Sequence, residues 1–316
     1  MDSVRYPLFL QCSYLCVGVV EDAIPYRLEK TMMRADCHIH MVFDGYDWKK
    51  AIDRHRAAPD RDWIRERLKE YAAAGFTYLR DGGDKWGVGL AAREEAGEWG
   101  ITYRTPLAPL ILEGHYGGFI GEKYRNIREY ADLVRKHRSD GADFIKLMIS
   151  GIMDFDHFGK LSEEGLDPSF IRELIHIAHE EGFVVMAHAN GARTVEAAAL
   201  AGVDSIEHGA YLDLDALHAM KENGTIWCPT LSAIGNLRGR GRFCEAAVNA
   251  IYGSAVENIR KFTKIDGILA PGSDAGAWAV PHGSGSMDEY AHLAHALGER
   301  TEAVIRTGIS AIRTRF

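Results

Sequence analysis

The chain has 316 residues, with 37 lysines and arginines against 45 aspartates and glutamates, which gives a formal net charge of −8. Its 47% hydrophobic and 26% charged residues are typical of a folded globular protein and exclude a disordered chain. The acidic balance argues against a nucleic-acid-binding protein, and no run of about 18 uninterrupted apolar residues predicts a membrane span.

The five cysteines, at positions 12, 16, 37, 228 and 244, are odd in number and scattered along the chain. This pattern fits reduced thiols in a cytoplasmic protein. The N-terminal apolar run is broken by polar residues and no clear small-residue cleavage site follows it, so we expect no cleaved signal peptide.

Residues 6–20 and 24–30 predict two short strands or a hairpin, which makes 1–33 a short N-terminal β segment. From residue 34 onward, short apolar runs rich in β-forming residues alternate with longer amphipathic stretches. The predicted strands are 35–40, 77–81, 103–110, 144–150, 184–189, 205–208, 226–231 and 268–273. The predicted helices are 60–74, 168–181, 194–201, 214–223, 243–264, 286–297 and 299–313.

Continuous apolar runs, rather than strict alternation, are typical of parallel strands that are covered on both faces. Eight strands that alternate with helices therefore predict an α/β fold, a (β/α)8 TIM barrel over residues 34–316. In such a barrel the chemistry lies at the C-terminal ends of the strands and in the loops that follow them.

Polar residues lie where this rule places functional groups. His38 and His40 end the first strand and point to the same side of it. Lys146 lies within an apolar strand, where a lone ammonium would be costly to bury. His188 and His208 end the next two strands along the chain. Asp274 follows the last strand.

Each of these residues alone has an ordinary structural explanation, as a packed histidine, a paired lysine or a turn aspartate. Together they place five metal-type ligands and a buried lysine at the same end of five strands, which favours a functional site.

The motifs ADCHIH, FIKLMISG, AHANG, IEHG and GSDAG, in this order and spacing, resemble the binuclear branch of the amidohydrolase superfamily. The resemblance covers about residues 34–298. The stretches AGVDSIEHG, YLD and WCPTL are most similar to imidazolonepropionase-like and Xaa-Pro or Xaa-Arg dipeptidase-like enzymes.

The resemblance implies that His38, His40 and Asp274 bind the more buried of two divalent metal ions, and that His188 and His208 bind the second. Lys146 would be carboxylated by CO2 and would bridge both ions. This set of ligands suits zinc best, although manganese, cobalt or nickel also fit. Members of the branch usually carry a β-sandwich built from both chain ends. We expect it to be reduced or absent here, with residues 1–33 pairing locally or across a dimer of a homo-oligomer.

Two ions that share a water molecule lower its pKa, and the resulting hydroxide can attack a polarised carbonyl. Asp274 would accept the proton and pass it to the leaving nitrogen. The sequence thus predicts a hydrolase of the C–N bond of a small substrate, such as a dipeptide, N-acyl amino acid or cyclic amide. Three alternatives stay open: a lactonase or phosphotriesterase-like hydrolase, a mononuclear deaminase, which Lys146 disfavours, and a binding protein without activity.

Loop residues near the predicted barrel mouth are candidates for substrate contact. They are His115, Tyr116, Tyr211 and His282. For each of them ordinary loop packing is an equally good explanation. Asp81, at the end of the second strand, is a candidate for orienting a ligand histidine, or else a helix cap.

Overall fold

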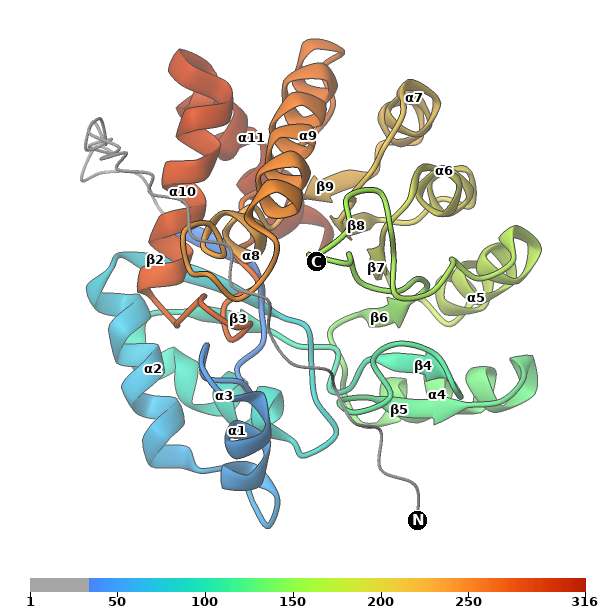
Figure 1. Cartoon of the computed structure of the whole chain (residues 1–316). Coiled ribbons are helices and arrows are strands. Elements are labelled where there is room, and N and C mark those ends of the chain that lie inside the picture. Colours follow the sequence, from blue (N-terminus) through green and yellow to red (C-terminus); the bar gives the residue numbers. More distant parts are fainter. Residues whose placement is uncertain (1–33) are drawn as a thin grey trace, which may run out of the picture.

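Nine parallel β-strands and eleven α-helices follow one another along residues 34–316, the part of the chain that the computed structural model describes (Figure 1). The predicted N-terminal β segment lies outside the described residues. The helices surround the strands on the outside (Figure 1). Among residues 34–316, no helix combines the length and the apolar character needed to cross a membrane.

The strands form two parallel sheets. The first has the order β1-β2-β3 and the second the order β5-β4-β6-β7-β8-β9. The strands are β1 (Arg34–Ile39), β2 (Phe76–Asp81), β3 (Thr102–Arg104), β4 (Leu110–Leu112), β5 (Glu122–Tyr124), β6 (Ile145–Met148), β7 (Val185–Ala189), β8 (Ser205–His208) and β9 (Ile226–Cys228).

The helices are α1 (Trp48–His55), α2 (Arg61–Ala73), α3 (Val88–Ala96), α4 (Ile127–Ser139), α5 (Pro168–Glu180), α6 (Ala192–Leu200), α7 (Leu214–Glu222), α8 (Ser232–Gly235), α9 (Glu245–Lys264), α10 (Ser284–Leu297) and α11 (Thr301–Arg315). Several begin at an aspartate or asparagine whose side chain accepts a backbone N–H of the first turn, as Asp60 and Asp167 do. These caps place α2 and α5 close to their predicted bounds.

The prediction of one strand over 103–110 is wrong. Pro106 and Pro109 lack the N–H that a strand ladder needs, and Leu107 has a positive φ of 66°. The segment is therefore divided into β3 and β4, and β4 pairs with β5 and β6 instead of β3. The backbone N–H of Asp143 donates to the carbonyl of Thr105 over 3.0 Å and links the two sheets at this point.

The predicted last strand, 268–273, lies between β9 and β1 but makes only isolated bridges. The Trp227 N–H donates to the Ile268 carbonyl over 2.9 Å, and the Cys37 N–H donates to the Pro271 carbonyl over 2.9 Å. Because Pro271 has no N–H, the ladder is interrupted there. The segment still connects the edge of the second sheet to the first.

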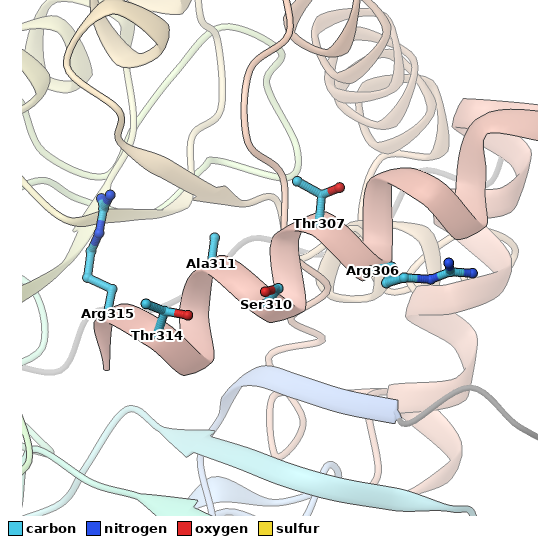
Figure 2. A pocket seen from close by; sticks show the side chains of 6 residues that line it. All are labelled: Arg306, Thr307, Ser310, Ala311, Thr314 and Arg315. Atoms are coloured by element: carbon cyan, nitrogen blue, oxygen red, sulfur yellow. The ribbon is translucent and has the colours of Figure 1, made fainter.

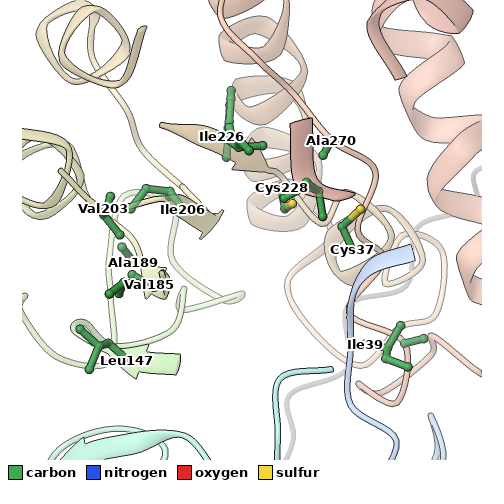
Figure 3. Close-up of a cluster of buried hydrophobic side chains, with 14 of the residues drawn as sticks. Cys37, Ile39, Leu147, Val185, Ala189, Val203, Ile206, Ile226, Cys228 and Ala270 are labelled. Atoms are coloured by element: carbon green, nitrogen blue, oxygen red, sulfur yellow. The ribbon is translucent and has the colours of Figure 1, made fainter. Parts of the chain in front are cut away.

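Buried apolar side chains from the strands form the centre of the core, and Figure 3 shows members of it on β1, β6, β7, β8 and β9. Helix α11 packs against the segment between β9 and β1. A Cβ added at Gly308 on α11 would overlap the carbonyl oxygen of Leu269. The absence of a side chain at Gly308 thus allows the helix to approach this backbone closely.

We predict that Gly308→Ala lowers the free energy of unfolding by about 1–3 kcal/mol, because the added methyl group has no space. The control is Gly253→Ala in α9, where nothing lies within 4 Å of the added carbon. There the substitution should raise stability by about 0.5–1 kcal/mol, since alanine favours helix. Urea unfolding measures both changes. Equal effects of the two substitutions would contradict the packing described here.

Candidate metal centre

His38, His40 and Asp274 form a compact cluster at the C-terminal end of β1. The Nε2 atoms of the two histidines lie 3.4 Å apart, and each lies 3.5 Å from Oδ1 of Asp274. All three ligand-type atoms lie within 4.8 Å of one another. The Asp274 N–H donates to the His38 carbonyl over 2.7 Å, which holds the carboxylate beside the strand that carries the histidines. The geometry suits a cation with nitrogen and oxygen ligands.

Two further histidines extend this cluster. The rings of His188, on β7, and His208, on β8, have centroids 4.6 Å apart, and the centroids of His38 and His208 are 5.0 Å apart. Nδ1 of His208 lies 2.7 Å from the Thr230 hydroxyl oxygen. This contact leaves Nε2 of His208 free to bind a ligand.

Lys146, on β6, is 1% exposed, and its Nζ has no hydrogen-bond partner among residues 34–316. Burial lowers the pKa of this amine to about 8. An unpartnered amine buried among strands is costly, and it lines the same cavity as His40, His188, His208 and Asp274. The structure thus brings all six predicted ligands to one end of the strands.

Burial also sets the charge of the ligand groups. It lowers the pKa of His40 and of His188 to about 3 each, and it lowers the pKa values of His38 and His208 well below the usual range. The four imidazoles are therefore neutral near pH 7, which is the form that binds metal ions. Burial raises the pKa of Asp274 to about 7, because no cation compensates its charge fully.

The sequence did not reveal that a buried ion pair orients His38. Oε2 of Glu207 accepts a hydrogen bond from Nδ1 of His38 at 2.6 Å, and Oε1 accepts one from Arg80 at 2.8 Å. The side chains of Glu207 and Arg80 are both completely buried. A carboxylate on one ring nitrogen fixes the tautomer and points the other nitrogen toward the cluster.

The backbone is strained at three residues around the centre. His208, Thr230 and Asp274 have φ values of 70°, 51° and 61°, a left-handed conformation that costs energy for any residue except glycine. Strain of this kind gathers at functional sites, where the surrounding structure enforces it.

The cluster opens into a cavity of about 540 Å³. Its wall is largely aromatic and apolar, and it includes Phe43, Tyr46, Trp48, Tyr116, Phe119, Met148, Ile152 and Trp278. The charged residues of the wall, apart from the ligands already described, are Asp47 and Arg242. An apolar cavity with a few polar groups at one end is typical of a site for a small molecule.

The predicted substrate contacts divide into two groups. Tyr116 lines the cavity, with its ring centroid 5.0 Å from that of His188. His115 lies beside Glu163, with Nδ1 and Oε1 3.6 Å apart, and is not part of the cavity wall. Tyr211 lines a neighbouring hollow of about 860 Å³. Of the four candidates for substrate contact, only Tyr116 lines the cavity beside the candidate ligands.

His282 and Asp81 hold loops in place. The two ring nitrogens of His282 contact the Tyr71 hydroxyl at 3.0 Å and the Phe43 carbonyl at 2.8 Å, so neither is directed into the cavity. The carboxylate of Asp81 accepts the N–H of Met41 at 3.2 Å and contacts Thr105 rather than a ligand histidine. Glu207 has the orienting position that the sequence suggested for Asp81.

Another hollow, of about 740 Å³, lies along α11 and is shown in Figure 2. Its lining consists of Arg306, Thr307, Ser310, Ala311, Thr314 and Arg315. None of these is a metal-type ligand, so the candidate site is the cavity at the strand ends.

Comparison with known proteins finds relatives by sequence and by structure. No family model matches the chain. The chain is 27% identical over 231 residues to ochratoxinase of Aspergillus niger, which covers 63% of this chain and 47% of that protein. It thus spans about half the length of this curated relative.

Solved structures show the same fold. A Xaa-Pro dipeptidase with bound methionine in the active site has a TM-score of 0.70 at 22% identity, over 89% of this chain and 75% of the other. The structure of A. niger ochratoxinase has a TM-score of 0.67 at 21% identity, over 89% and 69% of the two chains. An amidohydrolase has a TM-score of 0.68 at 20% identity, over 89% and 74%. These structures show that residues 34–316 share the fold of a dipeptidase and of an amidohydrolase.

We predict that Glu207→Gln lowers zinc affinity about 10- to 100-fold, because the amide no longer fixes the His38 tautomer. It should also lower stability by about 3 kcal/mol, since Arg80 keeps a buried, uncompensated charge. Chelator competition and thermal unfolding measure the two effects. The control is Glu257→Gln, which removes an exposed pair with Lys261 and should change stability by less than about 1 kcal/mol. Unchanged zinc affinity in folded Glu207→Gln would show that the ion pair does not orient the ligand.

Proposed function

We propose that this chain is a metal-dependent hydrolase that cleaves the C–N bond of an amide in a small substrate, such as a dipeptide, N-acyl amino acid or cyclic amide. One observation carries the proposal: four neutral histidines, a carboxylate and an unpartnered buried lysine meet at the end of an apolar cavity. Ordinary packing does not explain this set, because each of its members costs free energy to bury.

The donor set fits two divalent ions, for which zinc is the best candidate. His38, His40 and Asp274 would hold one ion, and His188 and His208 the other. Lys146 would bridge them as a carbamate: its Nζ bonds to the carbon of CO2 and releases a proton, which leaves an anion with two oxygen ligands. This reaction would give the buried amine the partners that it lacks. When bound, the ions would polarise the scissile carbonyl and acidify a water molecule.

The residues of the chain supply positioning and proton transfer. Asp274 would accept the proton of the attacking water and deliver it to the leaving nitrogen. Glu207 and Arg80 would keep His38 in the binding tautomer. The aromatic wall would exclude bulk water from the reacting groups and hold the apolar part of the substrate.

We also propose that the two sheets belong to one closed (β/α)8 barrel. Support comes from the segment 268–275, which bonds to both β9 and β1, and from the bond between Asp143 and Thr105 that links the sheets on the other side. Assembly as a homo-oligomer and a cytoplasmic location stay predictions.

An ester hydrolase of the lactonase or phosphotriesterase type would use the same ligands. The similarity to a dipeptidase and to an amidohydrolase supports the amide. A screen of zinc-loaded protein against matched amides, lactones and phosphotriesters tests the assignment. We expect chelator-sensitive release of amine from amides. Exclusive turnover of esters, or no turnover in any class, would overturn it.

We predict that Lys146→Ala loses zinc and activity together, because the bridging group is removed. Short carboxylic acids should restore part of both by occupying the space. Zinc content and turnover are measured on the same samples, with the exposed Lys221→Ala on α7 as the control, which should keep both. Full zinc content and activity in Lys146→Ala would exclude the bridge.

We predict that Asp274→Asn keeps much of its zinc while turnover falls about 10²–10⁴-fold, the usual effect of removing a general base. The amide retains the shape and one ligand oxygen but not the basicity. If turnover falls only in proportion to lost zinc, then Asp274 acts as a ligand alone and another group carries the proton.

A further inference from the structure

Arg242 stands apart from the other charged residues of the cavity wall. It lies in the loop that joins α8 to α9 (Figure 1) and lines the same cavity as Lys146, His188 and Asp274. Its guanidinium carbon lies 4.3 Å from the ring centroid of Trp278, another residue of the wall. Stacking on an aromatic ring uses the face of a guanidinium and leaves the N–H donors in its plane free.

The guanidinium forms no ion pair with a carboxylate among residues 34–316, where its contacts are with the rings of Trp278 and, at 5.4 Å, Phe243. The Arg242 side chain is exposed to solvent. The other cation of the wall is Lys146, which the proposed function places between the metal ions. Among the wall residues that the structure describes, Arg242 is thus the cationic group that remains available to a substrate.

The acidic residues of the wall do not neutralise Arg242. Asp274 belongs to the ligand cluster. Asp47 caps α1, where it accepts the N–H groups of Lys49 and Lys50, and its carboxylate lies 3.3 Å from Nζ of Lys50. These contacts lower the pKa of Asp47 and provide its countercharge locally.

We propose that Arg242 binds the carboxylate of the substrate and so selects amides that carry a free carboxylate together with an aromatic or apolar group. This inference rests on the proposed function, whose cavity and reaction it uses. The planar N–H donors of arginine match the two oxygens of a carboxylate. The aromatic wall formed by Phe43, Trp48 and Phe119 accommodates the apolar part. Arg242 is therefore a specificity-determining residue outside the ligand cluster.

The test compares binding of N-acetyl-L-phenylalanine with that of its uncharged carboxamide, by calorimetry on metal-free and zinc-loaded protein. Wild-type protein should bind the acid about 10-fold more tightly, the effect of a charge-assisted hydrogen bond that is partly open to solvent. Arg242→Gln should bind both ligands equally. The control is Arg240→Gln in the same loop, an exposed arginine outside the cavity wall, which should keep the wild-type preference. Circular dichroism confirms that each variant is folded.

A preference for the acid that is unchanged in Arg242→Gln, or absent from the wild type, would overturn the inference. The preference in metal-free protein separates binding by Arg242 from direct binding of the carboxylate to an ion. If acid and amide are hydrolysed with equal kcat/KM, the inference fails while the proposed function stands. If the binding preference depends on Arg242 but no amide is hydrolysed, the proposed function fails and the subsite remains.

Discussion

A buried contact between Arg80 and Glu207 connects the core of the strands to the candidate metal centre. Arg80, on β2, donates to the Cys37 carbonyl over 2.7 Å and to the Ser205 hydroxyl over 2.9 Å. Its guanidinium therefore connects β2 to the neighbouring strand β1 and to β8 in the other sheet. Removing two charges from water is costly, and these hydrogen bonds compensate the cost only when the strands keep their register. Because Glu207 also contacts His38, an error in register would displace this candidate ligand.

Around the strands, packing residues and candidate site residues occupy different positions. Apolar side chains occupy most strand positions, while four of the candidate ligands, His38, His40, His188 and His208, lie at or near the C-terminal ends of strands. The strained residues His208, Thr230 and Asp274 lie at these ends as well. Close packing limits the space around the His40 ring, because a Cβ added at Gly82 would overlap this ring. The fold thus packs the candidate ligands closely, and the proposed substrate specificity resides in the loops that follow the strands, such as the one with Arg242.

The candidate ligands could be predicted to lie together because strand ends can be recognised from local sequence patterns. His38 and His40 are two residues apart on a strand, and Lys146 is conspicuous in an apolar run. The same cost argument applies to Arg80 and Glu207, which also lie in strands, but their pairing spans 127 residues. A long-range contact of this kind depends on how the two sheets that carry β2 and β8 are placed relative to each other, and no local pattern records it.

Local patterns also failed where backbone chemistry decides the structure. The prediction of one strand over 103–110 did not take into account that Pro106 and Pro109 have no backbone N–H. The short strand β5 (Glu122–Tyr124) has two charged residues in three and shows no apolar run to detect. The role of His282 was unreadable for another reason, because its partners Tyr71 and Phe43 come from distant parts of the chain.

The proposed function requires these side chains to bind two metal ions side by side. Anomalous X-ray diffraction at the zinc edge, from crystals grown with zinc, detects such ions individually. We expect two peaks at the strand ends, one about 2.0–2.2 Å from the nitrogen and oxygen atoms of His38, His40 and Asp274 and one at a similar distance from His188 and His208. We also expect density for a carbamate on Lys146 between them. Zinc-saturated crystals with no peak among these side chains would contradict the proposed function.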